Sequence, residues 1–152
     1  MTLPMSAGEL ESYLHTHIPL SQAMGVAVTE VCPESVTVTA PLEPNINHRA
    51  TVFGGSASAV AVLAAWSLLH LRVRDAELNA HLVIQRNTME YDRPINGAFA
   101  ARAELADPYR WDLFRRTLQR RGRARIRVDS VLSCDGDAAA RLQGDFVALV
   151  AD

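Results

Sequence analysis

The chain has 152 residues, 49% of them hydrophobic and 21% charged, and a formal net charge of −2 at pH 7. These values are typical of one globular domain with a sizeable core, and they exclude intrinsic disorder, a collagen-like repeat and a disulfide scaffold. All fifteen basic residues are arginine. The lack of lysine excludes a Schiff-base lysine, covalently bound pyridoxal phosphate and a P-loop lysine.

The cysteines and the apolar segments indicate where the chain resides. Cys32 and Cys134 match no metal-ligand spacing, so we expect reduced thiols, no bound metal and no cofactor. The first residues have neither the basic start nor the apolar stretch of a signal peptide, which predicts a cytoplasmic location. The longest apolar run, residues 57–71, is shorter than the ~18 to 20 residues that span a bilayer. It therefore predicts a core helix and no membrane partner.

The first half of the chain predicts a helix, a hairpin and a loop. Apolar spacing over residues 7–17 fits a short amphipathic helix that ends by Pro19. Alternation over residues 26–31 and 35–40 predicts two strands joined as a hairpin. A loop from residue 41 to residue 53 follows.

The segment from about residue 56 to residue 71 predicts a helix that is apolar on nearly every side. A helix without a polar face has to be enclosed by other elements.

The second half returns to strand patterns. We expect strands over residues 81–91, 98–105, 123–132 and 139–148, and one further helix over residues 111–121. The third of these strands alternates most clearly, with charged side chains on one face and apolar or small ones on the other.

One-sided alternation is typical of antiparallel sheets. We therefore predict an α+β hotdog fold, a curved antiparallel sheet of about six strands wrapped around the central helix, as a single domain over residues 1–152. Such a sheet has open edges and leaves part of the helix uncovered. A homodimer or higher homo-oligomer that continues the sheet through residues 85–91 would resolve both problems.

The loop that precedes the central helix carries the strongest functional signal. Gly54 and Gly55 allow a ligand to approach the backbone closely, and the first N–H groups of a helix have no internal acceptors. These features predict an oxyanion hole. The alternative is that the glycines only permit a tight turn from loop to helix.

Three segments of the chain resemble a known family. They are NINHRATVFGGSASAVAVLAAW from residue 45, MEYDRPINGAFAARAEL from residue 89 and RRGRARIRVDSVL from residue 120. They resemble the hotdog thioesterase superfamily, specifically the thioesterase-like domain that also occurs fused to an acetyltransferase domain. The resemblance implies a hotdog fold, a site at a dimer interface and a substrate that is an acyl thioester of coenzyme A or acyl carrier protein.

The resemblance also implies roles for individual residues. The N–H group of Gly55 would polarise the thioester carbonyl, and Asn45 and Asn47 would place polar groups at the reacting atoms. For both asparagines the alternative is turn formation within the loop. Substrate contacts are expected from Phe53, Gly54, Ser56, His48, Asn87 and Tyr91.

Two departures from the family pattern bear on the reaction. Phe53 stands where many relatives have the histidine of an HGG motif, and Val62 stands where they carry a carboxylate in the helix. Hydrolysis needs a base to activate water, and an asparagine amide cannot accept a proton. The favoured reaction is therefore decarboxylation of a malonyl thioester, which the resemblance also implies. The alternatives are thioester hydrolysis and a binding module without catalysis.

Five arginines cluster locally in a slightly acidic chain: Arg115, Arg116, Arg120, Arg121 and Arg123. Arg121 and Arg123 are candidates for the phosphates of coenzyme A or of a carrier protein. The alternative is a solvated surface. Nucleic-acid binding is disfavoured, because the net charge is negative and no aromatic platform accompanies the arginines.

Overall fold

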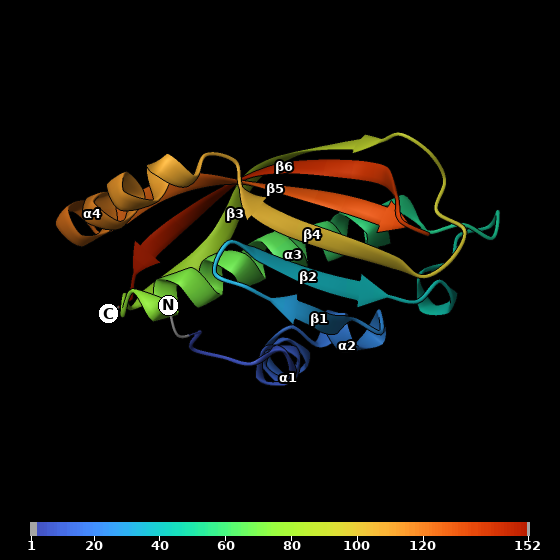
Figure 1. Ribbon diagram of the computed structural model, residues 1–152, viewed down its shortest axis with the longest axis horizontal. Helices are drawn as coiled ribbons and strands as arrows, with labels where there is room; N and C mark the ends of the chain where they lie inside the picture. Colours follow the sequence, from blue (N-terminus) through green and yellow to red (C-terminus); the bar gives the residue numbers. More distant parts are fainter. Residues whose placement is uncertain (1–2, 152) are drawn as a thin grey trace.

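The computed structural model describes residues 3–151. The strands are β1 (Ala27–Val31), β2 (Ser35–Ala40), β3 (Ala80–Tyr91), β4 (Phe99–Leu105), β5 (Arg123–Cys134) and β6 (Asp137–Val150). The helices are α1 (Ala7–His17), α2 (Pro19–Ala23), α3 (Gly54–Asp75) and α4 (Trp111–Arg121), with 3-10 turns η1 (Glu43–Asn45) and η2 (Pro108–Arg110). The six strands form one antiparallel sheet in the order β1-β2-β4-β5-β6-β3, which curves around α3 (Figure 1). The predicted hotdog fold is confirmed.

Helix α3 is longer than predicted at both ends. Gly54 and Gly55 already belong to its first turn, and at the other end it continues to Asp75. The extension is possible because Arg72 donates to the Pro33 carbonyl oxygen (2.9 Å) and its guanidinium lies 4.5 Å from the centre of the Trp111 ring. Length and composition alone would allow α3 to cross a membrane, but 61% of its most apolar window is buried within the fold.

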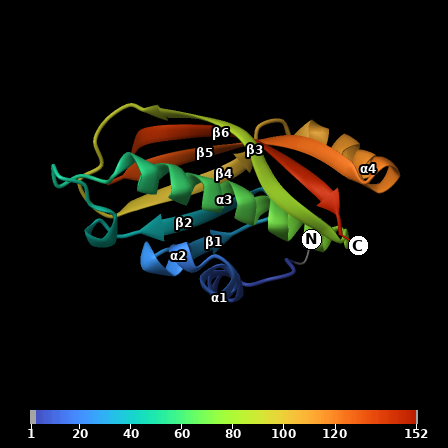
Figure 2. The ribbon, with the colours of Figure 1, turned by 180° about the vertical axis from the view of Figure 1, so that it is seen from behind.

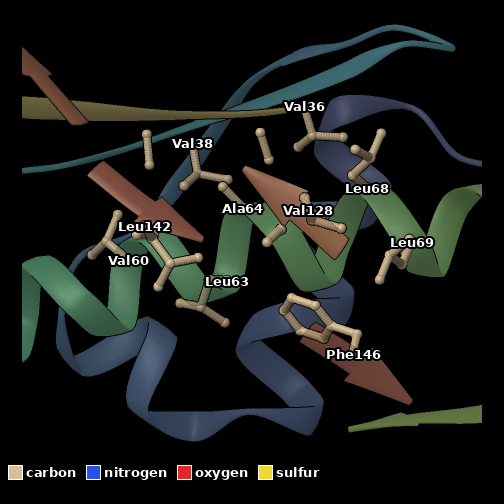
Figure 3. Packing of buried hydrophobic residues seen from close by; sticks show 14 of the residues in the cluster. Val36, Val38, Val60, Leu63, Ala64, Leu68, Leu69, Val128, Leu142 and Phe146 are labelled. Atoms are coloured by element: carbon tan, nitrogen blue, oxygen red, sulfur yellow. The ribbon is translucent and has the colours of Figure 1, made fainter. Parts of the chain in front are cut away.

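The core lies between α3 and the concave face of the sheet (Figure 3). The side chains drawn there include Val36, Val38, Val128, Leu142 and Phe146 from the strands and Val60, Leu63, Ala64, Leu68 and Leu69 from the helix. The alternation on β5 arises because every second side chain points at α3, while its arginines point away.

The N-terminal helices differ from the prediction in one respect. The first helix ends at His17 as expected, but a second short helix, α2, begins at Pro19. Proline suits the first helical position, because its fixed φ fits a helix and its missing N–H group would have no acceptor there.

The two edges of the sheet are β1 and β3. Helix α1 packs against β1. Strand β3 is 12 residues long and pairs only with β6 among the described residues. An open strand of this length offers a row of unpaired backbone groups to another strand.

Aromatic rings join α1 to α3. The His70 ring lies 4.6 Å from the ring of Tyr13 and 4.7 Å from that of Trp66, and the Trp66 indole donates to the Leu82 carbonyl oxygen. Burial, together with the positive charges of Arg74 and His17, lowers the pKa of His70 to about 4. His70 is therefore a neutral imidazole at pH 7.

Replacement of His70 by Phe should make stability less dependent on pH. Between about pH 6.5 and 4 the unfolded chain protonates this imidazole and the folded chain does not, so the wild type loses stability as pH falls through that window. Urea unfolding at several pH values in this window gives the free energy of unfolding as a function of pH. This free energy should change less with pH for His70→Phe than for the wild type. Replacement of the exposed His48 by Gln should leave the wild-type pH dependence unchanged. Parallel curves for all three proteins would contradict this account.

Candidate functional site

The first turn of α3 presents free hydrogen-bond donors. The N–H group of Ala57 donates to the Phe53 carbonyl oxygen, but within residues 3–151 those of Gly54, Gly55 and Ser56 have no protein acceptor, and no side chain caps the helix. The first turn also contains no acidic residue. Free donors at the positive end of a helix can bind an oxygen that carries negative charge.

Aromatic rings lie against both glycines, and the one on Gly55 comes too close for a Cβ atom. A Cβ atom on Gly55 would lie 2.4 Å from Cε2 of Phe53, so the Phe53 ring rests directly on Gly55. Tyr91 lies against Gly54 and donates its hydroxyl to the Gly54 carbonyl oxygen (3.2 Å). Neither glycine has a positive φ. The close approach of the Phe53 ring, rather than a left-handed turn, explains the glycine at position 55.

Asn45 forms part of the scaffold behind this turn. Its side-chain Nδ2 donates to the carbonyl oxygens of Met24 (2.9 Å) and Pro41 (2.8 Å). Its backbone carbonyl oxygen accepts from the N–H group of Phe53. The residue is buried. Both amide protons are thus engaged with the backbone, whereas the side-chain oxygen Oδ1 is buried and has no hydrogen-bond partner among the described residues. A contact with substrate through Nδ2 would have to break one of these bonds, and Oδ1 is the atom of this side chain left for a further contact. The catalytic role of Asn45 stays a prediction.

Asn47 shapes the tip of the loop. Its Oδ1 accepts from the N–H groups of Arg49 (2.8 Å) and Thr51 (3.1 Å), and its Nδ2 donates to Thr51 Oγ1 (2.8 Å). These bonds match the turn-forming alternative. His48 lies exposed on this turn.

A hollow of about 390 Å³ lies beside the first turn of α3. Its lining includes Thr51, Gly54, Ala57, Tyr91, Arg93 and Ile95. Arg93 was not foreseen, because its position before Pro94 suggested only a turn; its guanidinium donates to the Ala138 carbonyl oxygen. Asn87 lies exposed on β3, opposite Gly144.

The carboxylates on and just after the end of β3, beside Tyr91, are paired with an arginine. Glu90 and Asp92 both form ion pairs with Arg141, at 2.7 and 3.2 Å. Val62, at the position where relatives carry a helix carboxylate, lies half-buried on α3. Among the described residues, no group of three or more His, Cys, Asp or Glu side chains could hold a metal ion. The site therefore offers hydrogen-bond donors and apolar surface, and the two carboxylates described beside it are paired with Arg141.

Arg121 and Arg123 lie at the opposite end of the molecule from the first turn of α3. Arg123 is opposite Leu149 on β6, and Leu149 is opposite His81 at the start of β3, whereas the donors lie beside Tyr91 at its end. Ten residues of strand span roughly 33 Å. Figures 1 and 2 show α4 and the start of α3 at opposite ends of the molecule. One chain alone does not bring these arginines to the site.

Gly55→Ala should destabilise the fold only while the Phe53 ring is present. Alanine is a better helix former than glycine by up to about 1 kcal/mol, so in a Phe53→Ala background the same change should be neutral or stabilising. Urea unfolding of the wild type, both single variants and the double variant gives the coupling between the two positions. Equal effects of Gly55→Ala in both backgrounds would show that the ring does not require the glycine.

Comparison with known proteins gives the same fold and a family. A protein of unknown function from Chlorobaculum tepidum is 27% identical, with a TM-score of 0.90 over 95% of this chain and 94% of that one. A protein from Shewanella oneidensis described as a putative thioesterase is 26% identical, with a TM-score of 0.83 over 94% and 96%. A protein of unknown function from Pseudomonas aeruginosa, described as a probable thioesterase, is 20% identical, with a TM-score of 0.83 over 98% and 99%. Residues 7–150 match the model of one family, and the chain belongs to it: "Putative thioesterase (yiiD_Cterm)".

Proposed function

We propose that the chain acts on acyl thioesters at the first turn of α3, and that its preferred reaction is decarboxylation of a malonyl thioester. One observation carries this proposal: free backbone donors lie beside two exposed aromatic rings, and the carboxylates of Glu90 and Asp92 are paired with Arg141. The site is equipped to hold a developing oxyanion rather than to deprotonate water.

In this reaction the thioester carbonyl oxygen accepts a hydrogen bond from the N–H group of Gly55. The bond between the α-carbon and the carboxylate carbon breaks, carbon dioxide leaves, and the electron pair forms an enolate whose oxygen stays at the donor. The α-carbon then takes a proton from water, which yields the acetyl thioester. One such donor contributes about 3 kcal/mol, a hundredfold or more in rate.

Phe53 and Tyr91 support the same step by placing apolar rings beside the donors. Their exposed rings flank the two glycines. A carboxylate beside these rings loses hydration in the ground state, whereas the departing carbon dioxide is neutral. Asn45 supports this arrangement indirectly, because its backbone carbonyl oxygen accepts a hydrogen bond from the N–H group of Phe53.

Hydrolysis of the thioester is the main alternative, and family membership favours it. It requires a base beside the donors, and the candidates are His48 on the exposed turn and the paired carboxylates Glu90 and Asp92. A second alternative is a module that binds the thioester without reaction, because the same donors would hold an unreacted carbonyl group.

A homodimer would complete the site. Antiparallel pairing of two β3 strands around residues 85–91 would extend the sheet and bring the far end of the partner subunit beside Tyr91. Arg123 lies two strands inside its own sheet from β3 and level with His81, so in the dimer its backbone would come within about 20 Å of the partner's Tyr91. Arg121 and Arg123 could then meet the phosphates of coenzyme A or a carrier protein. Cys32 and Cys134 are free thiols, which suits the cytoplasm.

The products formed from malonyl and saturated acyl thioesters separate the candidate functions. We expect malonyl thioester to yield acetyl thioester and carbon dioxide, with little free thiol, and acetyl or longer acyl thioesters to stay intact. Mass spectrometry of the reaction mixture makes this measurement. Free thiol from saturated substrates, with malonyl thioester untouched, would establish hydrolysis, and no turnover with tight binding would establish the binding module.

A matched pair of variants tests the donor itself. Proline in the first turn of a helix removes an N–H group that has no helical acceptor. Phe53→Ala/Gly55→Pro should therefore decarboxylate about a hundredfold more slowly than Phe53→Ala, because the pair differs at the Gly55 donor with the overlying ring already removed. Similar rates would remove Gly55 from the mechanism.

A further inference from the structure

Among the described residues that line the hollow beside the first turn of α3, Arg93 alone carries a positive charge. The other charged residue of this hollow is Asp92, which forms an ion pair with Arg141 at 3.2 Å. Within residues 3–151 no carboxylate oxygen lies within 4 Å of the Arg93 guanidinium. The hollow therefore holds a positive charge that no acidic side chain of the described chain pairs with.

The start of β6 holds the side chain of Arg93 in place. Its Nε and Nη2 both donate to the Ala138 carbonyl oxygen, at 3.0 and 2.9 Å, and its backbone N–H group donates to the Ala139 carbonyl oxygen at 3.2 Å. A guanidinium has five N–H groups, so three of them have no acceptor within residues 3–151. A planar group that is fixed at one edge and free at another suits a carboxylate ligand, because the two groups can form parallel hydrogen bonds.

A backbone hydrogen bond joins the segment of Arg93 to the loop before α3. The N–H group of Val52 donates to the Ile95 carbonyl oxygen at 2.8 Å. Figures 1 and 2 show the chain that follows β3 and the loop before α3 at the same end of the molecule. Gly54 and Ala57, both in the first turn of α3, line the same hollow as Arg93. A small ligand in this hollow therefore lies between the start of the helix and the guanidinium.

A malonyl thioester has one group for each of these two features. Its thioester oxygen binds the α3 donors in the proposed function, and its carboxylate lies only one methylene group further along the acyl chain. A carboxylate that enters an apolar hollow loses hydration, and an ion pair with a guanidinium in the same hollow offsets part of that loss. A neutral acyl group gains nothing from the guanidinium. The charge of Arg93 therefore distinguishes between acyl groups.

We propose that Arg93 determines the acyl specificity of the site: its guanidinium binds the carboxylate of the acyl group and so selects a malonyl thioester over neutral acyl thioesters. The inference rests on the proposed function, because it places the thioester oxygen at the donors of α3. It concerns the acyl group alone and does not depend on which carrier bears the thioester.

The contact with Arg93 belongs to the bound substrate rather than to the transition state. As carbon dioxide leaves, negative charge moves from the carboxylate to the thioester oxygen. The ion pair with Arg93 is then lost, while the hydrogen bond from the N–H group of Gly55 becomes stronger. The acetyl thioester that remains has no group for Arg93 to bind, which favours its release. Arg93 thus supplies specificity at some cost in rate.

Stable ligands test the recognition of the carboxylate without any reaction. In two analogues of acyl coenzyme A an amide N–H group replaces the thioester sulfur. One analogue carries the malonyl group, and in the other a neutral carboxamide replaces the carboxylate. The wild type should bind the malonyl analogue about tenfold more tightly in calorimetry, since hydrogen bonds between charged groups are stronger than those to a neutral amide. Arg93→Gln should bind the two analogues about equally.

A matched variant and the ratio of the two affinities separate charge recognition from a structural role. Arg102→Gln removes one exposed arginine that is paired with Glu104 on the sheet, and it should keep the wild-type ratio. Loss of the bonds to Ala138 would weaken the binding of both analogues by the same factor. An unchanged ratio in Arg93→Gln, or equal affinities in the wild type, would overturn the inference. A ratio that falls in Arg93→Gln supports it even where mass spectrometry finds no decarboxylation, and then only the proposed reaction fails.

Steady-state kinetics with malonyl coenzyme A give a second readout. Arg93→Gln should raise KM about tenfold and leave kcat unchanged or higher, because the lost ion pair stabilises the bound substrate and not the transition state. Arg102→Gln should change neither constant. A lower kcat at unchanged KM in Arg93→Gln would overturn the inference, because it would assign the guanidinium to the transition state.

Discussion

Helix α3 has no polar face over most of its length, and this constraint determines the arrangement of the other elements. Burial of such a helix from several sides requires a sheet that curves, and the five strand pairings place all six strands around it. The start of the helix stays accessible, because Gly55 is exposed there. At its start the N–H groups of Gly54, Gly55 and Ser56 lack acceptors within residues 3–151, so free donors lie at the accessible end of a buried helix.

The loop before α3 is built to hold that turn in place. Asn45 fixes Phe53, Asn47 folds the tip of the loop, and Tyr91 bonds to the carbonyl of Gly54 from the last residue of β3. None of these bonds uses the free donors of the helix. The surrounding groups are aromatic rings and paired carboxylates, so the free donors are the main electrophilic element available to a thioester. This balance of donors over bases is the reason we propose a reaction through an enolate rather than through an activated water.

The sequence predicted the fold well because alternation and the unusual central helix are strong local signals. It missed the short helix at Pro19 and the last turn of α3, since the latter depends on Arg72 reaching Pro33 and Trp111 from elsewhere in the chain. At the site it pointed to the loop before α3 and to the glycine pair, whose roles stay predictions. It could not show that the amide of Asn45 faces two backbone carbonyls, or that Arg121 and Arg123 lie far from Gly55 within one chain, because both facts depend on tertiary placement.

The central claim is that the free donors of α3 bind the thioester oxygen. Nuclear magnetic resonance of the ¹⁵N-labelled protein, titrated with a malonyl analogue in which a methylene group replaces the thioester sulfur, tests this claim directly. The account predicts a saturable downfield shift of the amide proton of Gly55, with smaller changes at its neighbours Gly54 and Ser56. Saturating analogue that shifts other resonances and leaves these three amide protons unchanged would contradict it.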